Sequence, residues 1–209
     1  MTTPLLDTLA LKAAPGNAAL VVIDVQNDFV ADGGFFARIG ADVGFIQQSV
    51  PPLERLIESA RAAGVLVVFV QAIYDPPDLS AAMRERNART GSTLPRCLTG
   101  SWGADFYRVR PQATDVVIIK HRYSAMTDPA LPALLRERGI QSLLLTGVAT
   151  DTCVESTARD AYFADWYVTL VADCCAAASR GDHEGVLPRF SRDYGLVTTA
   201  QAVIDTWAA

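Results

Sequence analysis

The chain has 209 residues, of which 50% are hydrophobic and 20% are charged, with a formal net charge of −5 at pH 7. This size fits one domain with a sizeable core, so we expect a single domain over residues 1–209. The negative charge and the lack of a basic cluster exclude a typical nucleic-acid-binding protein, and no apolar run approaches the roughly 18 residues that predict a membrane span.

Continuous apolar runs alternate with helix-like segments along the chain. Runs that lack polar alternation predict strands covered on both faces, and the alternation with helices predicts a three-layer α/β domain. The predicted strands are 18–25, 65–70, 115–119, 142–146, 168–172 and 196–198, and the predicted helices are 51–64, 79–88, 129–138, 154–164 and 200–207.

The interval 75–111 contains no predicted strand, only the polar helix 79–88 and an irregular stretch that leads to Trp102. Long irregular stretches inside a compact domain usually cover or build a site. Trp102 is therefore a candidate wall of a pocket, although filling a surface groove or a subunit contact explains it equally well.

Cys153 lies where the predicted strand 142–146 gives way to a helix. Thr152 and Glu155 have the spacing of a capping box, which would put Cys153 in the first helical turn. Unpaired backbone N–H groups and the helix dipole would then favour the thiolate. The alternative is a small buried cysteine with a purely structural role. The other cysteines, Cys97, Cys174 and Cys175, are expected to be free thiols, because a chain of this length needs no disulfide framework.

Two charged residues close other apolar strands. Asp24 follows the run 19–23, and Lys120 follows the run 115–119. In an open parallel sheet the ligand crevice lies outside the carboxyl ends of the strands, so an acid, a lysine and a cysteine at three such ends can converge. Taken singly, each charged residue is also explained as a solvated strand end.

Together these segments resemble the isochorismatase-like cysteine hydrolases. That family carries a D-x-Q-x-D/N-F segment, a lysine after a later strand and a G-x-x-T-x-x-C-V-x-x-T motif, which here are DVQNDF at 24–29, Lys120 and GVATDTCVEST at 147–157. The resemblance covers about 18–203 and implies a six-stranded parallel sheet in the order 3-2-1-4-5-6. Residues 100–102, 120–124 and 153–160 look most like the ureidoacrylate amidohydrolases, and 173–177 also look like the biuret hydrolases.

The predicted function is hydrolysis of a C–N bond in a small ureido or carbamoyl compound. In this hypothesis Cys153 is the nucleophile, Asp24 accepts its proton, and Lys120 stabilises the thiolate and orients the acid. The backbone N–H groups of Ala149 and Cys153 would bind the oxyanion, and a thioester would form as ammonia or an amine leaves. The family resemblance further implies a cis peptide bond before Ala149.

Strand alternation places Arg122 on the side of Lys120, where it would bind a substrate carboxylate through its planar fork. A surface ion pair is the alternative interpretation of Arg122. Weaker candidates for contact with the substrate are Gln26, Asn27, Phe29, Tyr74 and Tyr123.

No cofactor or metal is predicted. His121 is expected to point away from Lys120, and His183 to lie at a helix N-terminus with a possible place at the rim of the site. Two separated histidines make no zinc motif. The first residues lack a secretory signal, so we expect a cytoplasmic protein. The resemblance implies a homo-oligomer, a dimer or a tetramer, that acts on a small molecule.

Three other functions fit part of the pattern. Vinyl-ether hydrolysis, as in isochorismatase itself, would use the same fold, but that chemistry needs no thiol. A non-catalytic small-molecule-binding protein would not need the acid, lysine and cysteine together. A dinucleotide-binding oxidoreductase would need a G-x-G-x-x-G loop in the first strand–helix turn, where this chain has DVQNDF.

Overall fold

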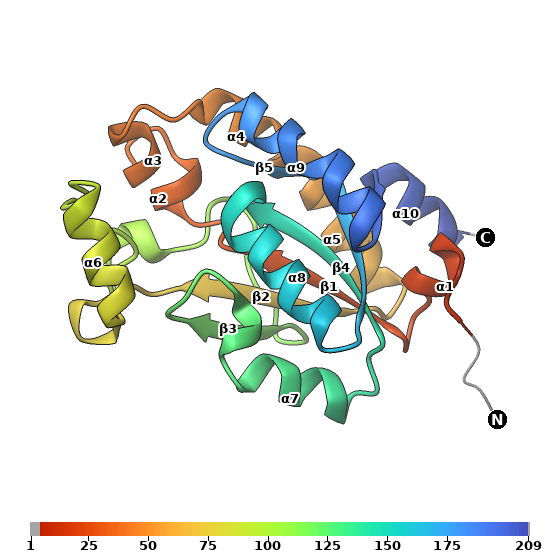
Figure 1. The fold of residues 1–209 in the computed structure, drawn as a ribbon. Helices are drawn as coiled ribbons and strands as arrows, with labels where there is room; N and C mark the ends of the chain where they lie inside the picture. The colour runs from red at the N-terminus through yellow and green to blue at the C-terminus, as the bar shows by residue number, and fades with distance from the viewer. Residues whose placement is uncertain (1–4, 209) are drawn as a thin grey trace.

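The computed structural model describes residues 5–208, which form one six-stranded sheet flanked by helices (Figure 1). All strands are parallel, and their order is β3-β2-β1-β4-β5-β6, as the resemblance implied. The strands are β1 (Ala18–Ile23), β2 (Leu66–Ala72), β3 (Val116–Lys120), β4 (Ser142–Val148), β5 (Tyr167–Ala176) and β6 (Leu196–Thr198).

Helices cover both faces of the sheet and complete the predicted three layers. One face packs against α1, α4, α5 and α10, and the other against α7, α8 and α9. In Figure 1, α8 crosses the near face, and α6 stands apart beyond the ends of the strands. The α-helices are α1 (Leu9–Ala13), α2 (Asn27–Val30), α3 (Phe35–Arg38), α4 (Val43–Gln48), α5 (Val50–Ala62), α6 (Ala81–Arg89), α7 (Ala130–Glu137), α8 (Glu155–Phe163), α9 (Arg180–Asp193) and α10 (Ala200–Ala208). Short helical turns are η1 (Pro76–Asp78), η2 (Trp102–Ala104), η3 (Ala125–Thr127) and η4 (Thr150–Val154).

The central strand β1 shows why the apolar runs are continuous. Its side chains alternate between two cores: Leu20 and Val22 pack on the α5 side, whereas Val21 and Ile23 pack on the α8 side. Every residue of β1 is buried, so every position requires an apolar side chain.

The edge strand β3 departs from that prediction. Ile118 packs against the α7 side, but Val117 and Ile119 on the opposite face are exposed. The prediction that both faces of this strand are covered is therefore wrong for β3. It is an edge strand, and only one of its faces is packed. The strand β5 is longer than predicted and includes Cys174 and Cys175.

All four cysteines are free thiols, as predicted. Trp166 is buried and donates its indole N–H to the Ile140 carbonyl oxygen at 2.9 Å, whereas Tyr162 and Phe163 at the end of α8 are exposed. Within residues 5–208, no helix has the length and apolar character needed to cross a membrane.

Gly147 lies where the carboxyl ends of β1 and β4 come together. Its φ is +112°, and a Cβ atom on this residue would collide with the carbonyl oxygen of Ile23. Ile23 pairs with Gly147 in the sheet and directly precedes Asp24. Glycine is required here because no other residue combines this backbone conformation with so close an approach.

We predict that Gly147→Ala lowers the free energy of unfolding by about 2 kcal/mol or more, because the clash is with backbone that cannot swing away. Gly185→Ala is the matched control. Gly185 is exposed inside α9 with open space around it, so alanine should stabilise by up to about 1 kcal/mol. Chemical denaturation of both variants measures the difference, and equal effects would contradict the role assigned to Gly147.

Candidate active site

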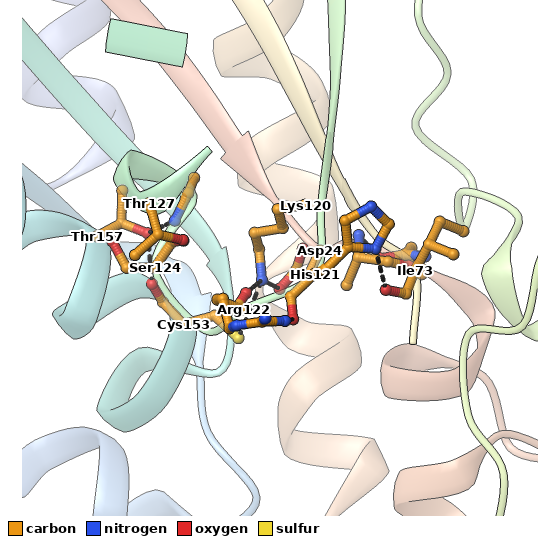
Figure 2. Close-up of polar contacts among 12 residues, drawn as sticks. Asp24, Ile73, Lys120, His121, Arg122, Ser124, Thr127, Cys153 and Thr157 are labelled. Atoms are coloured by element: carbon orange, nitrogen blue, oxygen red, sulfur yellow. Dashed lines mark hydrogen bonds and ion pairs between the residues drawn. The ribbon is translucent and has the colours of Figure 1, made fainter. Parts of the chain in front are cut away.

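Three chemically reactive side chains meet at the carboxyl edge of the sheet. Asp24 directly follows β1, Lys120 is the last residue of β3, and Cys153 lies in η4 immediately after β4. Figure 2 shows Lys120 between the other two, although the three residues come from distant parts of the chain. The prediction that they converge is therefore confirmed in its geometry.

Lys120 is the hub of this group. Its Nζ lies 2.7 Å from Asp24 Oδ2 and 3.5 Å from Cys153 Sγ, and it donates a hydrogen bond of 2.9 Å to the Arg122 carbonyl oxygen. Neither Asp24 nor Lys120 is exposed at all. Apart from the ion pair, the Asp24 carboxylate accepts no regular hydrogen bond from residues 5–208. It therefore has capacity to accept the proton of the neighbouring thiol.

The backbone around Asp24 is held by its neighbours. Asp24 adopts φ +54°, a left-handed conformation that aspartate tolerates better than most residues, and its N–H donates to the Val70 carbonyl oxygen at 3.0 Å. The buried Gln26 amide donates to the carbonyl oxygens of Ala72 and Ala104, both at 2.9 Å, and accepts the Ala72 N–H at 2.8 Å. Gln26 thus joins the ends of β1 and β2.

Cys153 lies in a π-helical turn rather than at the start of a capped α-helix. Thr152 is inside η4, and its N–H donates to the Ala149 carbonyl oxygen at 3.1 Å, so the predicted capping box was wrong. Glu155 instead accepts hydrogen bonds from Arg159 and Arg189, because these cations are within reach and the Thr152 backbone is already bonded. The peptide bond between Val148 and Ala149 is cis, as the resemblance implied.

The protonation of the site is dominated by burial. Burial raises the pKa of the Cys153 thiol to about 12, more than the charge of Lys120 lowers it. Burial therefore opposes the thiolate that the sequence predicts, since the loss of hydration at a side chain only 6% exposed acts against the cation beside it.

Burial also raises the pKa of Asp24, against the opposing influence of Lys120. For Lys120, burial acts to lower the pKa, but the charges and hydrogen bonds of Asp24 and Cys153 together outweigh it and the pKa rises. These effects favour the charged form of Lys120.

A cavity of about 380 Å³ opens onto Cys153. Asp24 and Lys120 are fully buried and do not line the cavity, so Cys153 is the member of the group that lies at its wall. Three of the predicted contact residues line this cavity: Phe29, Tyr74 and Tyr123. The remaining lining residues are Phe35, Phe36, Ile39, Arg86, Thr90, Gly91, Ser92, Arg96, Val148, Ala149 and Thr152.

Four predicted contact residues do not line the cavity. Gln26 is occupied by the bonds between strand ends, and Asn27 donates to the Trp102 carbonyl oxygen at 2.8 Å. The Trp102 side chain is 55% exposed, outside the cavity. Arg122 donates to the carbonyl oxygens of Asp78 and His121, both at 2.7 Å, because β3 ends at Lys120 and the alternation that aimed Arg122 at the site stops there.

The two histidines lie away from the sulfur. His121 contacts the Ile73 carbonyl oxygen at 2.9 Å and points away from Cys153, as predicted (Figure 2). His183 lies in the first turns of α9, where its Nδ1 is 2.8 Å from Thr150 Oγ1. Residues 5–208 contain no group of three or more His, Cys, Asp or Glu side chains that could hold a metal ion.

Sequence reasoning missed the aromatic and basic side chains that form the outer part of the cavity. Phe35 and Phe36 come from α3, Arg86 comes from α6, and Arg96 comes from the irregular stretch after α6. A short helix and an irregular stretch give no periodic signal, so only the packing of these segments reveals their role.

Comparison with known proteins places this arrangement among its relatives. The sequence model of the isochorismatase domain matches residues 18–202. The ureidoacrylate amidohydrolase RutB of Serratia proteamaculans is 33% identical over 96% of this chain and 86% of its own length. The protein of the same name from Acinetobacter baylyi is 30% identical over 95% of this chain and 86% of its own length.

Solved structures agree with the sequence relatives. A cysteine hydrolase from Pseudomonas syringae pv. phaseolicola superposes with a TM-score of 0.83 and 25% identity, covering 100% of this chain and 99% of its own. N-carbamoylsarcosine amidase from Thermoplasma acidophilum gives 0.72 and 29%, covering 88% and 96%. With its domain match, its relatives and its sheet order, this chain belongs to the isochorismatase-like cysteine hydrolases.

Proposed function

We propose that this protein is a cysteine-dependent amidohydrolase that cleaves a C–N bond of a small ureido or carbamoyl compound. The observation that carries the proposal is the contact of Lys120 with both Asp24 and Cys153, of which only Cys153 lines the cavity. Relatives named ureidoacrylate amidohydrolase and N-carbamoylsarcosine amidase support the ureido class.

The reaction begins with a protonated thiol. As the Cys153 sulfur attacks the carbonyl carbon, its proton passes to the Asp24 carboxylate, and Lys120 stabilises the negative charge on the sulfur. The tetrahedral intermediate collapses when Asp24 returns the proton to the departing nitrogen, which leaves as ammonia or an amine. A thioester remains on Cys153. Asp24 then takes a proton from water, which attacks the thioester and releases the acid and the thiol.

The oxyanion of each tetrahedral intermediate needs hydrogen-bond donors at the same place. We assign this role to the backbone N–H groups of Ala149 and Cys153, because both residues line the cavity around the turn from β4 into η4. The mechanism uses no metal or cofactor. The cytoplasmic location and the homo-oligomeric assembly stay predictions.

Vinyl-ether hydrolysis and simple binding remain the competing functions. A vinyl-ether hydrolase would not depend on the thiol, and a binding protein would release no product at all. Activity measurements with and without the Cys153 sulfur therefore distinguish the amidohydrolase, the vinyl-ether hydrolase and the binding protein.

We expect Cys153→Ala to lower the rate of ammonia release from ureidoacrylate, biuret or an N-carbamoyl amino acid by at least about 1,000-fold. The matched control is Cys174→Ala, which removes another fully buried thiol in β5 and should keep nearly full activity. A Cys153→Ala protein that retained a tenth of the wild-type rate would refute the thioester mechanism. Silence of the folded wild type on every ureido compound would refute the substrate class.

The pH dependence should report Asp24. Only the ionised carboxylate accepts a proton, and burial raises its pKa above the ordinary value of 3.8. Activity is therefore lost as the pH falls through this raised pKa, so the acid limb of kcat/KM should have its midpoint above 3.8.

Asp24→Asn should abolish this limb and lower the rate at neutral pH by about 100-fold or more. Asp160→Asn, on the exposed side of α8, should leave the profile unchanged. A wild-type acid limb in the Asp24→Asn protein would show that another group is the base.

A further inference from the structure

Arg96 is a buried cation at the wall of the cavity. It lies in the irregular stretch between α6 and η2, is only 9% exposed, and lines the same cavity as Cys153. Its Cζ is 5.2 Å from the centre of the Phe35 ring and 5.1 Å from the centre of the Tyr74 ring. Within residues 5–208, its guanidinium makes no hydrogen bond and no ion pair.

The two aromatic rings stabilise the positive charge of Arg96, but they leave its N–H groups without hydrogen-bond acceptors. Aromatic faces attract a guanidinium, but they offer no lone pairs in the plane of its N–H groups. A buried arginine without an acceptor is costly, and arginines in protein interiors are therefore normally paired with a carboxylate or a carbonyl oxygen. The N–H groups of Arg96 have no protein partner among residues 5–208, but they are not fully buried, since Arg96 lines the cavity and its nitrogens keep some contact with solvent there.

Tyr74 connects Arg96 to the reactive group. Lys120 Nζ lies 5.8 Å from the centre of the Tyr74 ring, the same ring that Arg96 approaches at 5.1 Å. Lys120 is in turn 3.5 Å from the Cys153 sulfur. Arg96 and the nucleophile therefore both lie near the Tyr74 ring and line one cavity, an arrangement that suits a short molecule with a different functional group at each end.

We propose that Arg96 binds a carboxylate of the substrate while the ureido carbonyl lies at Cys153, so that the substrate is a ureido acid and not a neutral compound such as biuret. This inference rests on the proposed amidohydrolase function and names its substrate class. A guanidinium binds a carboxylate through two parallel N–H···O bonds, which fixes both the position and the orientation of a short ligand.

The other arginines nearby do not offer this site. The guanidinium of Arg122 is engaged by the carbonyl oxygens of Asp78 and His121. Arg86 lines the cavity from α6, but it is exposed and its Nη1 lies 3.4 Å from Asn87 Oδ1. The matched control is Arg89, an exposed arginine of α6 that pairs with Glu85 at 3.0 Å and does not line the cavity.

The test measures binding without turnover, in a protein that carries Cys153→Ala. Isothermal titration calorimetry compares 3-ureidoacrylate with its neutral primary amide, which has nearly the same size and shape. Adding Arg96→Met should weaken binding of the acid by about 30-fold or more and binding of the amide by less than about 3-fold. Adding Arg89→Met should change either affinity by less than about 3-fold.

A second variant, Arg96→Lys, distinguishes loss of the carboxylate contact from misfolding of the Arg96→Met protein. Arg96→Lys keeps the charge and loses the fork, so it should bind the acid more tightly than the Arg96→Met protein and less tightly than the parent. Equal weakening of acid and amide, no weakening of either, or no binding of the acid by the Cys153→Ala protein would overturn the inference.

The two proposals fail separately in this design. If the acid binds in an Arg96-dependent way but the protein with an intact Cys153 does not hydrolyse it, the amidohydrolase proposal fails and the carboxylate site stands. If hydrolysis of the acid is fast and insensitive to Arg96→Met, the amidohydrolase proposal stands and the carboxylate site is overturned.

Discussion

The buried ion pair between Asp24 and Lys120 is the interaction on which the rest of the site depends. Their charged atoms lie 2.7 Å apart, and neither side chain is exposed. Removing two charges from water is costly, and either one alone would be strongly destabilising in this position. The pair therefore locks together the ends of β1 and β3, two strands that β2 separates in the sheet. It also holds a proton acceptor and a cation beside the sulfur without exposing them to solvent.

The sequence predicts the alternation of strands and helices and the reactive group well because both depend on short-range patterns, whereas the order of the strands came from the family resemblance. Apolar runs mark the strands, and Asp24, Lys120 and Cys153 each follow such a run. In a parallel sheet, one topological rule then brings the strand ends to a common edge. Gly147 fits the same logic, since the close approach of β1 and β4 leaves no room for a Cβ atom there.

The walls of the cavity could not be predicted in the same way. Arg122 was assigned to the site by extending the strand alternation, but β3 ends at Lys120 and the chain turns. Trp102 lies in the segment that builds the site, yet that segment contributes Arg96 to the cavity and leaves the indole outside. Phe35 reaches the cavity through the packing of α3 against α2, which the sequence pattern does not encode. These contacts are set by tertiary packing between segments that lack a periodic pattern.

The burial of Cys153 has a consequence for the chemical durability of the protein. Peroxides and alkylating agents react with thiolates, and a sulfur that is 6% exposed with its pKa raised to about 12 presents almost none at neutral pH. Many cysteine nucleophiles are kept ionised and are correspondingly open to oxidative damage. In the mechanism proposed here, the sulfur is activated only when a carbonyl group comes within its reach and Asp24 removes its proton. In that mechanism, the loss of hydration that raises the pKa of the thiol would also slow the reaction of Cys153 with oxidants between turnovers.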